Sequence, residues 1–223
     1  MQVLPAIIPH TKEQMEKEIK LVSGFARLIQ VDISDGIFAS TKSWPYNRRD
    51  LDFFEKLQTE ETGWPEWEKT DVELHLMVEN PEDIVLDWIK TGVTSIVAHI
   101  EVTNNFQKVI DICREHNVSV GVAIKPSTDV ALLEPFVGQV DFIQCMGSDQ
   151  LGKHGVTLDN KTLEQIKILH HLYPERIIGV DIGVTEETAG MLVSLGANKL
   201  ISGSAILNAE NPEEVFRYLE SLN

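Results

Sequence analysis

The sequence predicts an α/β protein built as a single (β/α)8 TIM barrel over residues 1–223. Short runs rich in Val and Ile begin near residues 3, 27, 71, 94, 118, 140, 176 and 197. Most of these runs are followed by a segment with helical periodicity. Eight such alternations, with no linker or low-complexity tract between them, favour a parallel sheet that closes into one barrel.

The spacing of the predicted strands indicates where the barrel is enlarged. Successive starts lie 21 to 24 residues apart, by subtraction of the positions above, except after strands two and six, where the spacings are 44 and 36. We therefore expect extra segments at about residues 37–69 and 146–158. The first segment contains Trp44, Trp64 and Trp67, and we expect this segment to reshape the rim of the barrel.

Several predicted helices carry recognisable end signals. Ser, Thr, Asp and Asn cap helix N-termini, Pro suits the first turn, and Gly tolerates the left-handed conformation that ends many helices. The expected start signals are Thr11 for a helix over 12–23, Asn80 with Pro81, and Asp159 or Asn160, and the expected stop signals are Gly92 and Gly196.

The predicted strands alternate between aliphatic residues and polar or small ones. In a barrel the aliphatic face meets the helices and the other face lines the interior. The interior set includes Gln30 and Asp32 in strand two, Glu73, His75 and Met77 in strand three, and Asp181 in strand seven. Polar side chains that come last in their strands are therefore expected at the carboxyl-terminal mouth, where such barrels carry their active sites.

An open doubly wound sheet is the competing fold, because it also alternates strands and helices. That fold normally has a Gly-rich dinucleotide loop after the first strand. Here Pro9-His10-Thr11 stands at this place instead. Together with the polar strand faces, this favours the barrel.

Composition excludes several classes of protein. Hydrophobic residues make up 43% and charged residues 24%, which is ordinary globular usage. With 19 basic and 35 acidic residues the net charge is −16, so no nucleic acid or anionic membrane partner is expected. The two cysteines, Cys113 and Cys145, suit a reducing compartment. There is no basic leader or long apolar run, and we expect a cytoplasmic protein.

Asp32 and Asp181 are candidate acid–base residues, since strands two and seven lie on nearly facing walls of an eight-stranded ring. Two such carboxylates can remove a proton from one side of a carbon beside a carbonyl and return one on the other. The resulting enediolate needs an electrophile, and Gln30, Asp32, His75 and Asp181 could share a metal ion. Each could also be an ordinary turn or core residue.

Two further polar residues and a set of glycines complete the candidate site. His99 is a candidate supporting residue, and Lys125 either neutralises the carboxylates or is an amine for Schiff-base chemistry. Backbone amides in loops seven and eight of such barrels form a standard phosphate cradle, although these glycines could equally be tight turns. The glycine-bearing segments are Asp181-Ile182-Gly183, Ser202-Gly203-Ser204 and loop six with Gly147, Gly152 and Gly155.

Taken together, the motifs resemble the ribulose-phosphate 3-epimerase family. The likeness extends over most of the chain, in the same order as the strands. The segments that carry it are Val31–Phe38, Glu73–Pro81, His99–Glu101, Ala123–Pro126, Met146, Val180–Gly183 and Ser202–Ile206. Glu73-Leu74-His75-Leu76-Met77-Val78-Glu79-Asn80-Pro81 is the most specific of these segments.

The resemblance implies an isomerase of pentose phosphate metabolism that acts on a small-molecule sugar phosphate. It implies that Asp32 and Asp181 are the acid–base pair, and that they bind one divalent metal, Zn, Fe, Mn or Co, together with His75. It also implies a possible homo-oligomer. The substrate- and phosphate-binding residues implied are Met77, Met146, Gly152, Gly155, Gly183, Gly203 and Ser204.

The sequence departs from the family pattern at several places. Gln30 stands where the family has a metal-binding His, and a neutral amide is a weaker ligand for zinc than imidazole. Ala6 replaces a Ser that helps to bind substrate, Ser34 replaces a Met, and loop six lacks the family's Pro-Gly-Phe-Gly-Gly.

The predicted function is a metal-assisted epimerase that inverts C3 of a ketose phosphate of the D-ribulose 5-phosphate/D-xylulose 5-phosphate type, through an enediolate. A non-catalytic or altered-substrate phosphosugar-binding barrel is the first alternative, since Gln30, Ala6 and loop six depart from the family. A Schiff-base aldolase that uses Lys125 is the second.

Overall fold

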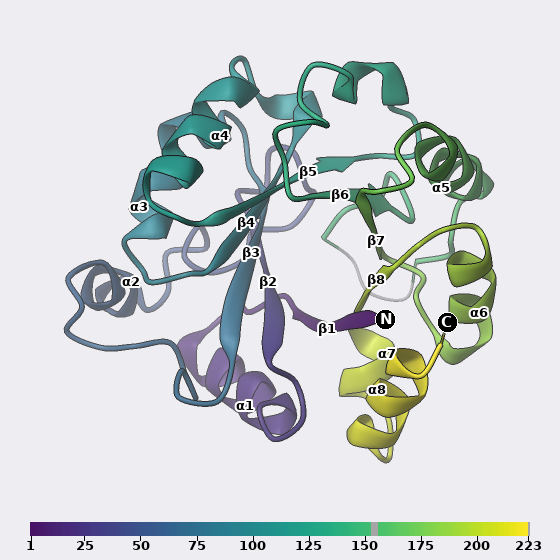
Figure 1. Cartoon of the computed structure of the whole chain (residues 1–223). Coiled ribbons are helices and arrows are strands. Elements are labelled where there is room, and N and C mark those ends of the chain that lie inside the picture. The colour runs from purple at the N-terminus through teal and green to yellow at the C-terminus, as the bar shows by residue number, and fades with distance from the viewer. Residues whose placement is uncertain (153–155, 223) are drawn as a thin grey trace.

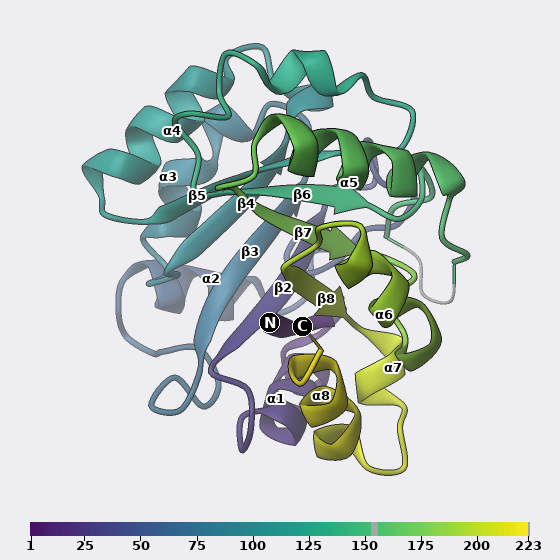
Figure 2. The ribbon, with the colours of Figure 1, turned by 45° about the vertical axis from the view of Figure 1, so that its right-hand side comes forward.

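The computed structural model describes residues 1–152 and 156–222. Eight parallel strands follow one another round a closed barrel in chain order, and the first strand pairs with the last. The strands form an inner ring and the helices lie around it (Figure 1). A view turned by 45° shows the same arrangement (Figure 2). The predicted (β/α)8 barrel is confirmed.

The predicted starts of all eight strands lie within two residues of the observed ones. The reason is that a buried parallel strand has a short, Val- and Ile-rich sequence that local pattern identifies well. The strands are β1 (Gln2–Ile7), β2 (Leu28–Ser34), β3 (Asp71–Met77), β4 (Ser95–His99), β5 (Ser119–Ile124), β6 (Phe142–Met146), β7 (Ile177–Asp181) and β8 (Lys199–Ser202).

The helices differ more in length than the strands do. They are α1 (Lys12–Val22), α2 (Leu51–Gln58), α3 (Val85–Ile89), α4 (Phe106–Glu115), α5 (Asn160–Leu172), α6 (Glu186–Ser194), α7 (Ser204–Leu207) and α8 (Pro212–Glu220). Three 3-10 turns accompany them: η1 (Pro81–Asp83), η2 (Ile100–Val102) and η3 (Val130–Leu133).

Most of the predicted helix ends are confirmed. The Thr11 side chain accepts a hydrogen bond from the Gln14 amide at the start of α1, and Asp159 accepts one from the Lys161 amide at the start of α5. Gly92 and Gly196 have φ angles of +82° and +112°, in the region that favours glycine.

Two expectations about helices are wrong. The segment that begins at Asn80 and Pro81 forms the 3-10 turn η1 before the short helix α3, and the Asn80 side chain caps nothing. Between β5 and β6, a fully described segment, the chain forms the turn η3 instead of an α-helix. There Asp129 accepts a hydrogen bond from the Ala131 amide and starts a 3-10 turn that ends after one round.

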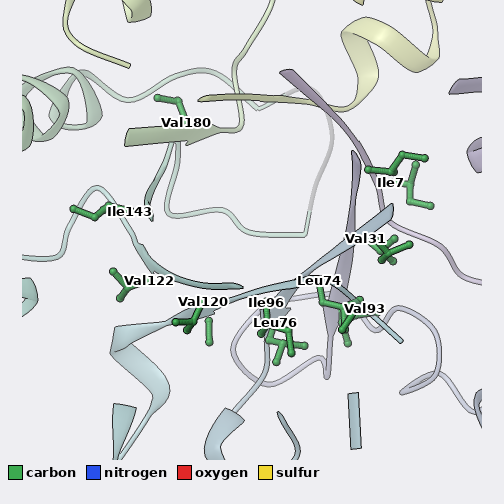
Figure 3. Packing of buried hydrophobic residues seen from close by; sticks show 14 of the residues in the cluster. Ile7, Val31, Leu74, Leu76, Val93, Ile96, Val120, Val122, Ile143 and Val180 are labelled. Atoms are coloured by element: carbon green, nitrogen blue, oxygen red, sulfur yellow. The ribbon is translucent and has the colours of Figure 1, made fainter. Parts of the chain in front are cut away.

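The main hydrophobic core lies between the sheet and the surrounding helices. Aliphatic residues on the outer faces of the strands, such as Leu74, Val122 and Val180, are completely buried in it. Figure 3 shows such side chains from β1 to β7. The alternate residues, among them His75 and Asp181, are buried in the interior instead, as the strand alternation predicted.

The enlarged segment after β2 packs in a way that the sequence did not indicate. Trp44 and Trp64 are buried in an aromatic cluster with Trp88 and Phe53, beneath the helix layer. Trp67 is 65% exposed. None of the three tryptophans lines the pocket at the mouth.

The part of this segment nearest β2 does reach the mouth. Thr41 donates a hydrogen bond of 3.0 Å to the carbonyl of Gly152 in loop six. Ala39 and Leu151 belong to one small apolar cluster with Met77 and Met146. Loops two and six therefore touch each other over one side of the barrel mouth. Over the described residues, no helix has the length and apolar character needed to span a membrane.

Candidate active site

Asp32, His75 and Asp181 meet inside the barrel at its carboxyl-terminal mouth. Asp32 and His75 are paired in register on the neighbouring strands β2 and β3, while Asp181 ends β7 on the other side. His75 Nδ1 lies 3.0 Å from Asp32 Oδ1 and 3.5 Å from Asp181 Oδ2. The two carboxylates are only 5% and 6% exposed. The structure thus brings together the two predicted acid–base residues and the predicted histidine ligand.

The surroundings raise the pKa values of Asp181 and His75. Burial and the charge of Asp32 raise the pKa of Asp181 to about 7, against a partial opposing effect of His75. Burial disfavours the charged form of His75, but the hydrogen bond and charge of Asp32, together with Asp181, outweigh it and raise the His75 pKa. Close to neutral pH, Asp181 is therefore present in both its proton-donating and its proton-accepting form.

A second pair of side chains lies behind His75. His75 Nε2 lies 3.0 Å from Nε2 of His99, and His99 Nδ1 lies 3.0 Å from Glu101 Oε2. Burial and the charge of His75 lower the pKa of His99 to about 4, despite Glu101. Although Glu101 is mostly buried, its hydrogen bond and the charge of His99 lower its pKa to about 2. His99 therefore contacts the candidate site from behind, through His75.

A pocket opens over Asp32 and Asp181 at the mouth. Its floor and walls come from β1 to β3, β6 to β8 and the loops that follow β6, β7 and β8. Six residues predicted to bind substrate line it: Met77, Met146, Gly152, Gly183, Gly203 and Ser204. The seventh, Gly155, lies outside the described residues. Ala6 also lines this pocket, as the resemblance implied for its position.

The loops after β7 and β8 give one side of the pocket a backbone surface. Ile182 and Gly183 both have positive φ angles, +77° and +76°, directly after Asp181. Gly203 precedes α7, at whose start the backbone N–H groups have no partner within the helix. No Lys or Arg side chain is among the described residues that line the pocket.

The comparisons with known proteins agree with this geometry. The sequence model of the Ribulose-phosphate 3 epimerase family matches residues 2–207. The chain belongs to this family. It is 30% identical over 154 residues to the ribulose-phosphate 3-epimerase of Schizosaccharomyces pombe, covering 69% of this chain and 67% of that protein. It is 27% identical over 212 residues to the enzyme of the same name from Bacillus subtilis, covering 92% of each.

Membership of the ribulose-phosphate 3-epimerase family confirms the predicted resemblance and the predicted enzyme class. A solved structure of 3-hexulose-6-phosphate synthase from Salmonella typhimurium superposes with a TM-score of 0.73 at 17% identity, covering 98% of this chain and 96% of that one. At that identity the likeness shows only a shared fold.

The donor set at the mouth fits the divalent metal that this family of epimerases uses. One oxygen each from Asp32 and Asp181 and one nitrogen from His75 all lie within 4.8 Å of one another. Two carboxylates and an imidazole are a mixed oxygen and nitrogen set that suits Zn, Fe, Mn or Co. These three residues would hold such an ion.

The structure does not bring Gln30, the fourth predicted ligand, into this group. Its amide nitrogen donates hydrogen bonds of 2.9 Å to Glu73 Oε1 and to Gln144 Oε1. These hydrogen bonds hold the Gln30 amide in a deeper layer than Asp32, which lies two residues later on the same face of β2. Gln30 is paired in register with Glu73, not with His75.

Lys125 also lies apart from the pocket. Its ammonium group is 4.7 Å from the centre of the Phe38 ring, and this ring packs edge-on against His99. Lys125 is not among the residues that line the pocket. Its backbone amide donates a 2.7 Å hydrogen bond to Glu101 Oε1. Lys125 is therefore linked to the side chains behind His75 through its main chain.

A buried ion pair deeper in the barrel was missed by sequence reasoning. Lys199 Nζ lies 2.7 Å from both carboxylate oxygens of Glu73, and both residues are almost completely buried. The ammonium also lies 3.4 Å from the centre of the Phe142 ring. Gln30 and Gln144 connect this pair to the mouth, because the Gln30 amide nitrogen donates to both Glu73 and Gln144 and the Gln144 amide nitrogen is 3.5 Å from Asp181 Oδ2. Strand alternation, applied to β6 and β8, would have indicated that Gln144 and Lys199 point inward.

Proposed function

We propose that this protein interconverts the C3 epimers of a ketose phosphate, of the D-ribulose 5-phosphate and D-xylulose 5-phosphate type. The observation that carries the proposal is the pair of buried carboxylates, Asp32 and Asp181, that share one pocket and flank His75. The names of the curated relatives support the choice of substrate.

The paired carboxylates support a two-residue proton transfer. In one direction, ionised Asp32 removes the proton from C3 of the substrate, and Asp181 in its neutral form delivers a proton to the opposite face of the same carbon. In the other direction the two residues exchange roles. A pKa of about 7 for Asp181 suits both roles, since neither form is strongly disfavoured near neutral pH.

Removal of the C3 proton leaves an enediolate whose negative charge must be stabilised. A divalent metal held by Asp32, His75 and Asp181 would supply this stabilisation at the oxygens beside the reacting carbon. The chain's own part is to exclude water and to hold the carbon between the two carboxylates. Met77 and Met146, which belong to one apolar cluster, give the pocket an apolar wall for this purpose.

The phosphate group would bind at the other side of the pocket, against the loops after β7 and β8. Gly183, Gly203 and Ser204 line the pocket there, and the first N–H groups of α7 have no partner within the helix. Among the described lining residues, the acidic side chains are Asp32 and Asp181. A single phosphate held by backbone amides needs no Lys or Arg.

The test is solvent exchange at C3. The purified protein, supplied separately with Zn²⁺, Mn²⁺, Fe²⁺ or Co²⁺, is incubated with ribulose 5-phosphate in deuterated water and followed by proton NMR. We expect loss of the C3 proton signal and formation of xylulose 5-phosphate. Allulose 6-phosphate, a hexulose phosphate, is the second substrate. No exchange with either sugar under any of the four metals would contradict the proposal.

The same experiment separates the alternatives. Tight binding of ribulose 5-phosphate without exchange would favour a phosphosugar-binding barrel that has lost catalysis. A Schiff-base aldolase would form an adduct at Lys125 that borohydride traps, and mass spectrometry would find it on that residue. The place of Lys125 outside the pocket lining speaks against this second reaction.

A further inference from the structure

A chain of hydrogen bonds joins the buried ion pair to the floor of the mouth. It begins at Lys199 and Glu73 and continues through the side-chain amides of Gln30 and Gln144. All four side chains are at most 2% exposed, so each depends on the others for its hydrogen bonds. Because a carboxamide has one donor end and one acceptor end and cannot change its tautomer, such a chain has a direction.

The direction is set at the ion pair. The Lys199 ammonium lies 2.7 Å from both oxygens of Glu73, and the Ser95 hydroxyl donates to one of them at 2.8 Å. A proton shared between the ammonium and the carboxylate lies on the side of Glu73 that faces Lys199, whichever group holds it. The side that faces Gln30 therefore offers lone pairs only, and Gln30 must turn its NH₂ group toward it.

The same NH₂ group fixes the second amide. Gln30 Nε2 donates one hydrogen to Glu73 Oε1 and the other to Gln144 Oε1, both at 2.9 Å. Gln144 thus has its oxygen toward Gln30 and its NH₂ group toward the mouth, where its nitrogen lies 3.5 Å from both Asp181 Oδ2 and His75 Nδ1. Turning this amide over would bring the NH₂ groups of the two glutamines together, whatever the charge of Asp181.

We infer that Lys199 is a positioning residue: acting through Glu73 and the two glutamines, it turns the NH₂ group of Gln144 toward Asp181. There this group holds Oδ2 of the carboxylate and leaves the other oxygen for the reacting carbon. Contacts to a catalytic carboxylate are often long before substrate binds and tighten in the complex. The inference rests on the proposed function in one respect only, namely that Asp181 exchanges a proton with the substrate.

The first measurement is neutron diffraction from a crystal of the perdeuterated, metal-free protein, which distinguishes the nitrogen from the oxygen of each amide. We expect the Gln30 nitrogen to face both Glu73 and Gln144, and the Gln144 nitrogen to face Asp181. A Gln144 oxygen facing Asp181 would overturn the inference, whether or not any variant folds.

The second measurement is steady-state kinetics of the double variant Glu73→Gln/Lys199→Met. It leaves no unpaired charge, but the amide at position 73 can turn either end to Gln30, so the direction of the chain is released. We expect kcat for epimerisation of ribulose 5-phosphate to fall about 10-fold and KM to stay within about twofold, because neither residue is among the described residues that line the pocket. If the folded double variant kept the kcat of the natural protein, the inference would be overturned.

Ser95→Ala is the matched control for the double variant. It removes another donor to the same carboxylate but keeps Lys199 and Gln30, and hence the direction of the chain. We expect its kcat to stay within about twofold of that of the natural protein. An equal loss of kcat in the control and the double variant would count against a role for the direction and would overturn the inference.

Gln144→Met tests the last link of the chain. It keeps the length of the side chain but has no NH₂ group, and we expect a similar loss in kcat of about 10-fold. Since Glu73 and Lys199 act through this one group, adding Gln144→Met to the double variant should cause no further loss. Losses that multiply would mean that the ion pair acts by another route, contrary to the inference.

The neutron result does not depend on catalysis. If the natural protein shows no C3 exchange but has the expected amide orientations, the proposed function fails and the assignment to Lys199 stands. If exchange is observed but Gln144 turns its oxygen to Asp181, the assignment to Lys199 fails and the proposed function stands.

Discussion

Glu73 with Lys199 in the depth of the barrel and Asp32 with Asp181 at its mouth are both buried charged groups, but they differ in what surrounds them. The deeper carboxylate has partners on every side: Lys199 at 2.7 Å, Ser95 at 2.8 Å and Gln30 at 2.9 Å. The carboxylates at the mouth share His75 and face an open pocket. A closed network holds a structure in place, whereas carboxylates with free oxygens can bind and transfer protons.

The largest expected effect is at the mouth. Asp32→Asn and Asp181→Asn should each slow C3 exchange roughly 10²- to 10⁴-fold, because an amide can neither remove nor deliver the proton. Exchange rates by proton NMR check this, and circular dichroism checks folding. Asp111→Asn, a change at an exposed position, is the control and should leave the rate unaltered. If either variant exchanged the C3 proton as fast as the natural protein, that aspartate would not be an acid–base residue.

The next effect is on stability and belongs to the deeper layer. Lys199→Met leaves the Glu73 carboxylate buried without its counter-charge, which should lower the free energy of unfolding by about 3–5 kcal/mol. The double variant Glu73→Gln/Lys199→Met removes both charges and should recover most of this loss. Urea denaturation measures all three proteins. If the single and double variants had the same reduced free energy of unfolding, the loss in Lys199→Met would not come from an unpaired Glu73 charge.

The next prediction concerns Glu101, which contacts His99 behind the mouth, and the pH dependence of the unfolding free energy. The pKa of Glu101 is lowered from 4.5 to about 2, so the folded protein binds fewer protons than the unfolded chain between these values. Its contribution, roughly 3 kcal/mol, is therefore complete above pH 4.5 and is lost as the pH falls through 2. Unfolding free energies of the natural protein and Glu101→Gln should converge over this range. A difference in unfolding free energy that stayed constant with pH would contradict a lowered pKa of Glu101.

The smallest expected effect is at the residue that joins the two layers. Gln144→Leu removes the acceptor of one Gln30 N–H and should reduce the free energy of unfolding by about 1–3 kcal/mol. Thermal and urea unfolding measure it. A leucine variant as stable as the natural protein would mean that the layers are not connected through this side chain.

The barrel could be predicted from the sequence because its strands obey a local rule. A parallel strand covered by helices needs aliphatic residues at every second position, and this pattern is present in the residues themselves. The missing helix after β5 could not be predicted in the same way. Leu133 is buried and Phe136 packs against Phe106, and tertiary contacts of this kind can override helix propensity, which alone is a weak guide.

The site shows the same limit. Asp181 ends β7, and Asp32 and His75 lie near the carboxyl ends of β2 and β3, so the topology of a barrel was enough to bring them together. Gln30 has the same strand face as Asp32, and only the register with Glu73 shows that its amide is bound in the deeper layer. Lys199 begins a strand, where a lysine ordinarily lies in solvent, and its partner is far away in the chain.

The pairing of β1 with β8 has a consequence for the order of folding. Gln2 lies opposite Lys199 in the closed sheet, so closure joins segments separated by nearly the whole chain. Contacts of such long range carry a large loss of loop entropy and form late. Until β8 docks, both β1 and β7 have an unpaired edge, and Glu73 has no ammonium partner. Docking of β8 therefore closes the sheet and neutralises the buried carboxylate of Glu73 in one event. Before this event the barrel is incompletely closed, and this intermediate is the species most prone to associate incorrectly with other chains.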